Sequence, residues 1–571
     1  MITRRGFIEI AAATAAVTGL GARLGRAAAA GAISQDDLLR FTPAGQLTIL
    51  HMSDCHAQLE PIYCREPSHN LGVGAARGRA PHLTGEAFLK AFGIAPHSPE
   101  AYMLTSADYQ ALARTYGRVG GMDRIATLVK AIRAERGADR VLLLDGGDLL
   151  QGSYTSLKTK GADMIAVAQA LGVAATTGHW EFTLGEKRIE ELFGNIERPG
   201  SSGIPFLAGN VRDTDFAEPV FHATHMFERG GLRVGVVGQA FPYTPIANPR
   251  WMIPRWSFGI RESDVRKSVA AMRREGADIV LLLSHNGFDV DRKLAERVEG
   301  IDVILTAHTH DAVPAPVRVG RTLLIASGSQ GKFLSRLDLE VKNRAVTGFA
   351  YRLVPVLSDA ITPDADMAKL IADVRAPHAG MLKTELARTE GLLYRRDTFS
   401  GTFDDVICDA LLTGREAEIA FSPGFRWGTS LPAGHPVTWE DVYNATAITY
   451  PAAYRVTMSG AMIKTVLEDV ADNLFNPDPY YQQGGDMVRT GGLGFAIDVD
   501  APAGRRISGL HLSKSGAALE PGKDYVVAGW GSINENTEGP PVWDLLAAYL
   551  KDRKVITARA PENVKFSRAA N

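Results

Sequence analysis

Leu47-Thr-Ile-Leu-His-Met-Ser-Asp-Cys-His56 is the stretch of sequence around which the rest of the chain is organised. An apolar run, typical of a buried strand, ends here in Asp54 and His56. Residues two positions apart point to the same side of an extended chain, so this carboxylate and this imidazole can bind one cation. The stretch therefore predicts part of a metal site at the end of a strand.

Four further motifs between residues 140 and 311 carry the same kinds of side chain after apolar runs. They are Gly147-Asp148, Gly178-His179-Trp180-Glu181, Ser284-His285-Asn286-Gly287 and Ala307-His308-Thr309-His310. A single histidine after a strand is usually a structural residue, so each motif alone is weak evidence. In α/β sheets, however, ligands collect at the carboxyl ends of the strands. Five such motifs in one domain predict a common metal site.

The types of ligand indicate which ions would bind. Carboxylates mixed with neutral imidazoles suit manganese, iron or zinc, whereas magnesium and calcium prefer shells made of oxygen alone. A carboxylate such as Asp148 can bridge two ions about 3.5–4 Å apart, with a hydroxide between them as the nucleophile. Two divalent ions, less two aspartate charges and one hydroxide, leave about one positive charge. We therefore expect an anionic substrate.

The chain has 571 residues, which is long enough for two domains. Strands alternate with helical periodicity from residue 120, which predicts an α/β domain over residues 45–357 with a mostly parallel sheet covered by helices. Residues 60–115, with scattered glycines, prolines and histidines, predict an insertion of loops and short helices. Residues 358–388 predict a linker helix, and residues 389–560 a second α/β domain.

The composition describes an ordinary globular protein, with 45% hydrophobic and 22% charged residues. A formal net charge of −2 gives no general attraction to nucleic acid or to acidic membranes. We expect neither partner, and no later stretch is long and apolar enough to span a bilayer. Three cysteines, at positions 55, 64 and 408, show no disulfide framework. A Cys55–Cys64 bridge and a buried free thiol at Cys55 both fit the sequence.

Residues 1–30 differ from the rest of the chain. Arg4 and Arg5 precede an apolar, alanine-rich segment that ends in small residues at Ala27–Ala30. This order is typical of a twin-arginine export signal, which carries folded cargo. We expect cleavage near Ala30 and a periplasmic protein that acquires its metal ions before export. The alternative is a disordered, alanine-rich N-terminus.

The five motifs resemble those of the calcineurin-like two-metal hydrolases, in particular the exported 5′-nucleotidases. The resemblance continues in the second half of the chain. Phe425-Arg426-Trp427-Gly428 is similar to that family's substrate-binding arginine turn, and residues 437–464 are similar to its C-terminal domain block. The resemblance implies two ligand sets that share one aspartate: Asp54, His56, Asp148 and His310 for one ion, and Asp148, His179, His285 and His308 for the other.

The third motif departs from the nucleotidases, which have Gly-Asn-His-Glu there. In that family the asparagine binds metal and the histidine assists the leaving group. Here His179 occupies the metal position, and Trp180 occupies the acid position, although tryptophan has no labile proton at neutral pH. Together with residues 54–61 and 178–185, this resembles SoxB, the family of periplasmic sulfate thiohydrolases of thiosulfate oxidation.

The SoxB resemblance implies a reaction, a cofactor and a partner. The reaction is the hydrolytic release of sulfate from a cysteine S-thiosulfonate on the carrier protein SoxYZ, by a hydroxide held between two Mn²⁺ ions. Zn²⁺ and Fe are alternatives to manganese. Asp148 and Arg426 would be catalytic, and Trp180 and Arg426 would line the substrate channel. We expect no organic cofactor and a monomer.

A physical argument explains why such an enzyme can dispense with the acid. A nucleotidase expels an alkoxide, which needs protonation in the transition state. Cleavage of an S–SO₃⁻ bond expels a persulfide-type sulfur anion, which is a much weaker base. Trp180 is then tolerated and lines a dry channel. The alternative is that Trp180 only packs against its neighbours.

A protein-bound substrate also gives the insertion a role. We expect residues 60–115 to form part of the docking surface for the carrier, and Tyr480–Asp486 to line the cleft. Two other functions compete with this hypothesis. One is a periplasmic 5′-nucleotidase or related phosphoesterase with the same fold and metals. The other is a non-catalytic metal-binding or scaffold protein that retains the fold.

Overall fold

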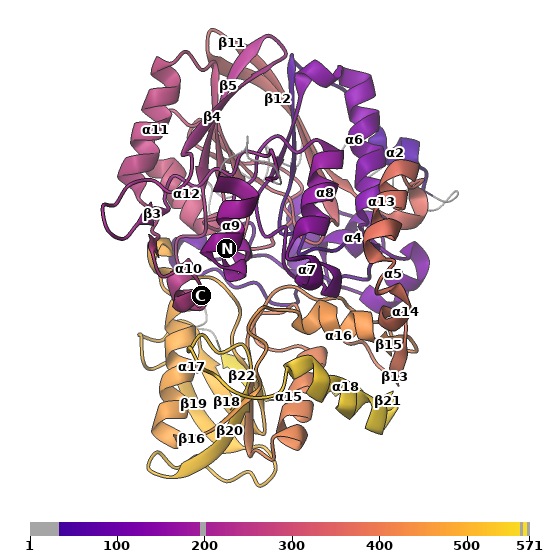
Figure 1. Cartoon of the computed structure of the whole chain (residues 1–571), viewed down its shortest axis with the longest axis vertical. Helices are drawn as coiled ribbons and strands as arrows, with labels where there is room; N and C mark the ends of the chain where they lie inside the picture. The colour runs from indigo at the N-terminus through magenta and orange to yellow at the C-terminus, as the bar shows by residue number, and fades with distance from the viewer. Residues whose placement is uncertain (1–32, 195–200, 560–562, 568–571) are drawn as a thin grey trace.

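The computed structural model describes residues 33–194, 201–559 and 563–567. The expected export signal at residues 1–30 lies outside the described residues. Figure 1 shows two domains, with the N-terminal one in indigo to magenta above the orange and yellow C-terminal one. Within the described ranges, no helix is long and apolar enough to cross a membrane.

Two sheets face each other in the N-terminal domain, with strand orders β12-β11-β1-β2 and β4-β5-β7-β8-β10-β9. The first contains β1 (Leu47–Met52), β2 (Val141–Asp145), β11 (Phe333–Lys342) and β12 (Ala345–Pro355). The second contains β4 (Thr224–Arg229), β5 (Leu232–Gln239), β7 (Ile279–Ser284), β8 (Val303–Thr306), β9 (Val317–Val319) and β10 (Thr322–Ala326). One apolar cluster joins residues of both sheets, such as Ile49 and Leu281.

The strands differ in direction between the two sheets. In the second sheet β5, β7, β8 and β10 run parallel, as the alternation of strands and helices predicts. In the first sheet only β1 and β2 are parallel, and β11 pairs antiparallel with both β1 and β12. Asn343 and Arg344 join β11 to β12 with positive φ angles, which is the backbone of a tight hairpin. A hairpin joins two neighbouring strands directly, without the crossover connection that parallel strands need, so β11 and β12 are antiparallel.

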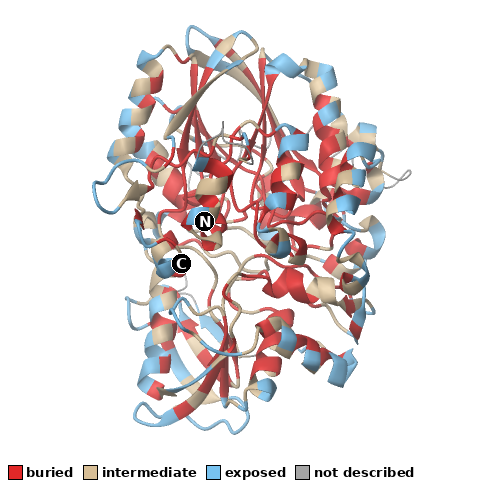
Figure 2. Cartoon of the chain, in the orientation of Figure 1, coloured by how far each residue is buried: buried red, intermediate tan, exposed pale blue. Residues whose placement is uncertain are grey.

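Helices cover the outer faces of both sheets (Figure 1). On one side lie α6 (Met122–Arg136), α8 (Ala162–Leu171) and α13 (Ala365–Arg375), and on the other α11 (Glu262–Arg274) and α12 (Phe288–Arg297). Shorter elements of this domain are α2 (Gln35–Leu39), α7 (Tyr154–Thr159), α9 (Glu186–Ile189), α10 (Thr244–Ala247), β3 (Arg212–Asp213) and β6 (Trp256–Ser257). Figure 2 shows buried residues along the central strands and exposed residues on the outer helix faces.

The insertion after β1 folds into the core of the N-terminal domain. It contains α3 (Gly85–Phe92), α4 (Pro99–Leu104) and α5 (Tyr109–Tyr116). Phe88, Phe92 and Tyr102 are buried and belong to the same apolar cluster as α6. Deleting the whole segment would expose this apolar surface, so its predicted docking role has to be tested with surface substitutions.

The C-terminal domain follows α13 and α14 (Ala379–Leu382). Its three small sheets have the strand orders β15-β13-β21, β16-β20-β14-β17 and β19-β18-β22. Their strands are β13 (Glu385–Thr389), β14 (Ile419–Ser422), β15 (Pro436–Thr438), β16 (Tyr454–Ser459), β17 (Arg489–Gly491), β18 (Leu493–Asp498), β19 (Ile507–Leu512), β20 (Asp524–Gly529), β21 (Val555–Ile556) and β22 (Val564–Ser567). Its helices are α15 (Thr402–Gly414), α16 (Trp439–Thr446), α17 (Gly460–Leu474) and α18 (Val542–Arg553).

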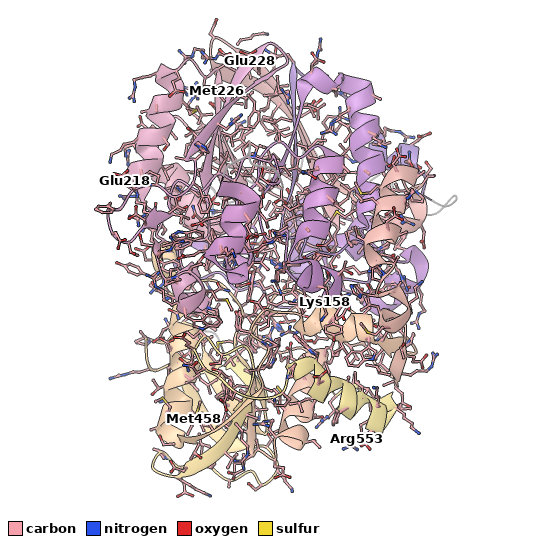
Figure 3. All side chains as sticks on the ribbon, in the orientation of Figure 1. Lys158, Glu218, Met226, Glu228, Met458 and Arg553 are labelled. Carbon is pink, nitrogen blue, oxygen red and sulfur yellow. The ribbon has the colours of Figure 1, made fainter. Side chains whose placement is uncertain are left out.

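Side chains fill the space between the two domains (Figure 3). Gln330 donates from its side-chain amide to the carbonyl oxygen of Gly428, at 2.7 Å, and Gln151 donates to that of Ala447, at 2.5 Å. These bonds hold the C-terminal domain against the carboxyl ends of the strands in the N-terminal domain. The predicted site therefore lies in an interdomain cleft.

Candidate metal centre

The structure brings together the seven side chains that the sequence analysis assigned to metal binding. They form two buried groups that share Asp148: Asp148, His179, His285 and His308, and Asp54, His56, Asp148 and His310. Within each group, one ligand atom from each residue lies within 4.8 Å of all the others. The residues follow β1, β2, β7 and β8, except His179, which follows isolated β-bridges at Ala175 and Thr176.

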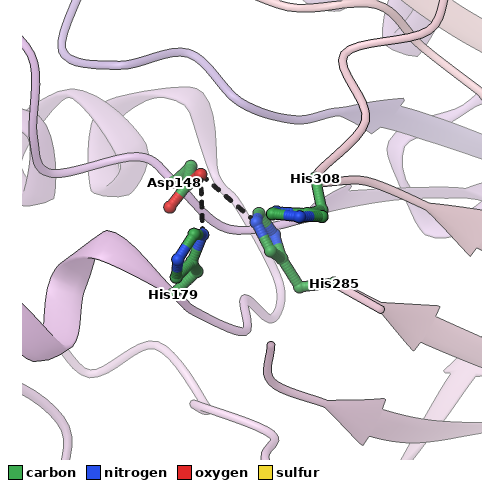
Figure 4. Close-up of side chains that lie close together, drawn as sticks. All are labelled: Asp148, His179, His285 and His308. Carbon is green, nitrogen blue, oxygen red and sulfur yellow. Dashed lines mark ion pairs between the residues drawn. The ribbon is translucent and has the colours of Figure 1, made fainter. Parts of the chain in front are cut away.

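The carboxylate of Asp148 lies at the centre of the site (Figure 4). Its Oδ2 atom is 3.2 Å from Nε2 of His285, 3.4 Å from Nδ1 of His179 and 3.6 Å from Nε2 of His56. Its Oδ1 atom accepts a hydrogen bond of 2.8 Å from the backbone N–H of Trp180. One oxygen thus faces ligands of both groups while the other is fixed by the backbone, as a bridging carboxylate requires.

The ligand atoms of the second group also lie close together. Nε2 of His310 is 3.1 Å from Nε2 of His56 and 3.4 Å from Oδ1 of Asp54. The same carboxylate accepts the backbone N–H of His308 at 3.0 Å. Two imidazole nitrogens that face each other beside a carboxylate are arranged as ligands of one cation.

The backbone at the site is strained. Non-glycine residues rarely adopt positive φ angles, and each such residue costs on the order of 1–3 kcal/mol. Five of the seven ligand residues do so: Asp54 (50°), His56 (47°), Asp148 (54°), His308 (74°) and His310 (59°). Strain of this kind collects at functional sites, where the surrounding structure holds side chains in positions that a relaxed backbone would not give.

Backbone carbonyls orient two of the imidazoles. Nδ1 of His285 is 2.6 Å from the carbonyl oxygen of Gly146, and Nδ1 of His56 is 3.2 Å from that of Gln151. A carbonyl only accepts, so each Nδ1 carries a proton and each Nε2 is turned toward the centre.

Two further residues orient His179, and the sequence analysis gave neither a role. Oδ1 of Asn248 lies 3.1 Å from Nε2 of His179, which leaves Nδ1 to face Asp148. The buried carboxylate of Glu181 accepts the backbone N–H groups of His179 at 2.8 Å and of Leu149 at 2.6 Å. Glu181 belongs to the quoted third motif. Asn248 has no signal in the sequence, because it lies 69 residues from His179.

The electrostatics of the site suit cations. Burial alone would raise the pKa of Asp148, but His179 and His285 lower that pKa well below its usual value. Burial lowers the pKa values of His308 and His310 well below the usual value, so both imidazoles are neutral. Among the residues that the structure describes, Nε2 of His285, both ring nitrogens of His308 and Nδ1 of His310 have no hydrogen-bond partner. Buried lone pairs without partners fit two divalent metal ions.

A cavity of about 160 Å³, which we call the inner chamber, is lined by five of the ligand residues: His56, Asp148, His179, His308 and His310. Its other walls are Trp180, Phe241, Ala247, Gly424–Trp427 and Gln483–Asp486. Trp180 is only 6% exposed, and its ring lies edge-to-face with Trp427 at 4.6 Å and with Phe425 at 4.9 Å. It also belongs to the apolar cluster of the C-terminal domain. Trp180 therefore both lines the chamber and packs across the domain boundary.

Arg426 lies between this inner chamber and an outer chamber on the same cleft. Its Nη1 donates to the carbonyl oxygen of His308 at 3.1 Å, and its Nη2 to that of Gly485 at 2.6 Å. The carboxylate of Asp486 lies 3.4 Å from its Nε. The guanidinium is thus fixed beside a metal ligand, where its charge reaches both chambers.

The loop from Gln482 to Asp486 packs closely against the candidate ligand His308. Gly484 has a φ of 74°, and a Cβ atom there would lie 2.1 Å from Nε2 of His308. Only glycine permits this approach. Gln483–Asp486 line the inner chamber, whereas Tyr480 and Tyr481 line a separate surface groove beside Tyr243. Gln482 lines the outer chamber of the same cleft, so the expectation that Tyr480–Asp486 lines the cleft holds for Gln482–Asp486 and not for the two tyrosines.

The cysteines form no disulfide. Cys55, Cys64 and Cys408 are all free and buried. Cys64 donates from Sγ to Oε1 of Gln330 at 2.9 Å, and Cys55 packs in the core of the N-terminal domain. Of the two alternatives at Cys55, the structure has the buried free thiol.

Comparison with known proteins assigns both domains. Residues 47–312 match the family described as calcineurin-like phosphoesterase, and residues 380–544 match the 5′-nucleotidase C-terminal domain. The 5′-nucleotidase of Rattus norvegicus is 24% identical over 517 residues, which cover 79% of this chain and 86% of the rat protein. A 5′-nucleotidase precursor from Thermus thermophilus shares the fold, with a TM-score of 0.71, 20% identity and coverage of 91% and 99%. Fold and site define a hydrolase of the 5′-nucleotidase type with a candidate two-metal centre.

One solved structure is more similar. The sulfate thiohydrolase SoxB of Thermus thermophilus, in complex with glycerol, has a TM-score of 0.87 and is 37% identical. The match covers 92% of this chain and 98% of the Thermus protein. The chain belongs to the SoxB family of sulfate thiohydrolases, within the 5′-nucleotidase and calcineurin-like superfamily.

Proposed function

We propose that the protein releases sulfate by hydrolysis from a cysteine S-thiosulfonate on the carrier protein SoxYZ, with two Mn²⁺ ions in the site. Membership in the SoxB family supports the reaction, and the mixed set of aspartates and neutral histidines supports manganese over magnesium. The two ions would supply Lewis acidity and activate water as the nucleophile at neutral pH.

The observation that carries the proposal is the side chain of Trp180 in the wall of the inner chamber. Besides the ligand residues, the titratable and cationic groups that the structure describes in this wall are Arg426 and Asp486. Arginine does not give up its proton in proteins. Asp486 lies 3.4 Å from Arg426 and 3.3 Å from Arg489, so its carboxyl group is engaged by two cations. A leaving group that departs as a stable sulfur anion needs no acid and fits this chamber.

The chain itself would perform the remaining tasks. The backbone N–H of Trp180 holds Asp148 in place, and Asn248 fixes the orientation of His179. Arg426, next to His308, would attract the sulfonate and stabilise charge on its oxygens. The aromatic side chains of Trp180, Phe425 and Trp427 exclude water, which strengthens these electrostatic interactions.

The size of the inner chamber favours a small reacting group. Its volume of about 160 Å³ is below the ~300 Å³ at which pockets for drug-sized ligands begin. A sulfonate on the tip of a carrier arm needs little room beyond the reacting atoms. A nucleotide would also need space for a base and a sugar, which the inner chamber alone does not offer.

The test is sulfate release from recombinant SoxYZ whose carrier cysteine bears a thiosulfonate, followed by ion chromatography, with AMP as the control substrate. We expect metal-loaded protein to release sulfate and to leave AMP almost untouched. Faster hydrolysis of AMP than of the carrier adduct would overturn the proposal. Reconstitution with Mn²⁺, Zn²⁺ or Fe²⁺ in parallel shows which ion supports activity. Metal analysis of the protein from its native source shows which ion it binds there.

The proposal also includes export to the periplasm as a folded protein and a docking surface on residues 60–115. Replacement of Arg4 and Arg5 by lysine should retain the protein in the cytoplasm, which cell fractionation measures. Charge reversal at exposed positions of the insertion, such as Lys90, should weaken binding of SoxYZ. Unchanged affinity in a set of such folded variants would exclude the insertion as the docking surface.

A further inference from the structure

The outer chamber contains a chain of polar side chains that the proposed reaction does not use. Its members come from three parts of the N-terminal domain: Asn70 and His82 from the insertion, Asp289 from the first turn of α12, and Asp311 next to His310. All four line the outer chamber. His308 and Arg426 line both chambers, so the outer chamber adjoins the candidate metal centre.

The orientation of Asn70 is fixed by its neighbours. Its Nδ2 atom is 2.8 Å from Oδ1 of Asp311 and 3.3 Å from the carbonyl oxygen of Pro81. Both partners accept hydrogen bonds, so the amide nitrogen has to face them. The amide oxygen of Asn70 therefore faces Nδ1 of His82, at 2.8 Å.

This orientation sets the protonation of His82. Its Nδ1 has to donate, because the oxygen of Asn70 only accepts. Its Nε2 lies 2.8 Å from the carboxylate of Asp289, which also only accepts. An imidazole that donates from both nitrogens is an imidazolium ion. His82 therefore carries a full positive charge within the wall.

The surrounding charges agree with this assignment. Burial lowers the pKa of His82, but Asp289 and Asp311 outweigh burial and Arg292, and the pKa is raised overall. Burial also acts on Asp289, yet His82 and Arg292 lower the pKa of that carboxyl group. Asp289 and Arg292 belong to α12, and Asp311 follows His310 in the loop after β8. Asp289 and Arg292 thus act on His82 from α12, and Asp311 acts on it from the loop after β8.

The charge of His82 changes the balance of charges in the lining of the outer chamber. The described lining contains three carboxyl groups, on Asp289, Asp311 and Asp486, and two permanent cations, Arg396 and Arg426. Without a charge on His82 the carboxylates outnumber the cations and would repel an anion on its way to the metal centre. With the charge, the chamber is balanced.

We propose that His82 is a specificity-determining residue that holds a fixed positive charge in the wall of the outer chamber and thereby raises the affinity for anionic substrates. That the anion is a sulfonate rests on the proposed function. The preference for anions over neutral molecules does not, because it follows from the charges in the wall.

The test compares three variants that separate charge from structure. His82→Gln removes the charge, and Asp289→Asn removes the opposite charge from the same hydrogen bond. His97→Gln is the matched control, because His97 forms a similar pair with Asp108, at 2.9 Å, but is exposed at the surface of the same insertion. Calorimetric titration of each metal-loaded protein with thiosulfate and with sulfate at pH 6 measures anion affinity.

We expect His82→Gln to weaken binding of both anions about fivefold, the order expected for one charge at about 10 Å. Asp289→Asn should leave anion binding unchanged or strengthen it at a pH low enough to keep His82 protonated, because Asp289 also raises the pKa of His82. His97→Gln should have no effect. Anion binding by the unsubstituted protein should fall as the pH rises through the raised pKa of His82, and His82→Gln should remove this fall. Metal content, measured for each variant, should stay constant.

Two results would overturn the proposal. One is equal weakening by His82→Gln and by an Asp289→Asn variant whose ¹⁵N spectrum shows His82 protonated at both ring nitrogens, because then the hydrogen bond matters and not the charge of His82. The other is a ¹⁵N spectrum, assigned by difference with His82→Gln, in which one ring nitrogen of His82 is unprotonated at pH 6. Both measurements are equilibrium properties, so they stand whether or not the protein releases sulfate from SoxYZ.

Discussion

The cleft has two sides that are built in different ways. We call the seven ligand residues, Asp54, His56, Asp148, His179, His285, His308 and His310, the metal floor. We call Trp180, Phe425, Arg426, Trp427 and residues 484–486 the cleft wall. The floor comes entirely from the N-terminal domain, and hydrogen bonds to carbonyl, amide and carboxylate groups fix it. The wall comes mostly from the C-terminal domain, and it is made of stacked rings and a glycine loop.

The difference shows how the two tasks are divided between the domains. In the proposed reaction, the floor would set the type of reaction, because it would bind the ions that activate water. The wall would set which substrate reacts, because it limits the volume and supplies the charge next to the ions. Trp180 belongs to both sides, since its backbone holds Asp148 and its ring packs on Trp427. Four substitutions can break or sharpen this division.

The largest effect is expected from Asp148→Asn, which removes the carboxylate shared by both groups of the floor. Loss of an outer partner of a ligand already costs about 10–100-fold in affinity or activity. Loss of the shared ligand should lower sulfate release by more, on the order of 10³-fold, together with the bound metal. Metal analysis and the sulfate-release assay measure both.

Asp145→Asn is the matched control for that substitution. Asp145 lies three residues before Asp148 and belongs to neither ligand group. Its side chain is buried, and burial raises its pKa to about 8. The carboxyl group is mostly protonated at neutral pH, so asparagine is a close substitute and metal content should stay normal. An equal loss of metal in both variants would mean that the floor is not centred on Asp148.

A smaller effect on the floor is expected from Asn248→Ala. The substitution removes the oxygen that faces Nε2 of His179, so His179 loses its fixed tautomer and orientation. Affinity for Mn²⁺ should fall about 10–100-fold, as titration calorimetry can measure. Thermal unfolding of the metal-free protein is the control, and it should change little. Unaltered affinity would show that His179 needs no outer partner.

The wall is tested by Trp180→His, which restores the residue of the nucleotidases at this position. We expect sulfate release by metal-loaded protein to stay within about threefold, because a sulfur anion leaves without a proton. The free energy of unfolding should fall by about 2 kcal/mol, because the smaller ring leaves a gap against Phe425 and Trp427. A large fall in turnover at full metal load would contradict this account of the leaving group.

The smallest effect concerns a carboxyl group that belongs to neither side of the cleft. Burial, with Asp404 nearby, raises the pKa of Asp405 in α15 to about 7. Between pH 4 and 7 the folded state therefore binds a proton that the unfolded chain releases, so this group makes the protein less stable as the pH rises. Asp405→Asn should raise stability at pH 8 by about 1 kcal/mol and leave it almost unchanged at pH 4. Denaturant unfolding at the two pH values measures the difference, and an equal change at both would contradict it.

The sequence predicted the metal floor well, because its signals are local. An apolar run followed by Asp54 and His56 marks a strand end, and parallel strands bring such ends together. The same argument predicted α/β domains but not the antiparallel first sheet. That sheet depends on the two-residue turn at Asn343 and Arg344, whose residue types are weak signals of a hairpin.

The other parts of the site depend on residues that no local pattern connects. Asn248 reaches His179 across 69 positions, and His82 reaches Asp289 across 207. Trp180 was predicted either to line a channel or to pack, and the structure has it do both. Tertiary packing decides such contacts, within the N-terminal domain for Asn248 and His82 and across the domain boundary for Trp180.

The sequence by itself thus determined which candidate ligands come together in two buried groups, because strand periodicity and side-chain chemistry are encoded within a few residues. The tertiary structure alone decided the size of the inner chamber, the position of Gly484 against His308 and the charge state of His82. These properties arise from distances between segments far apart in the chain, and hydrogen-bond geometry and burial act only once those segments meet.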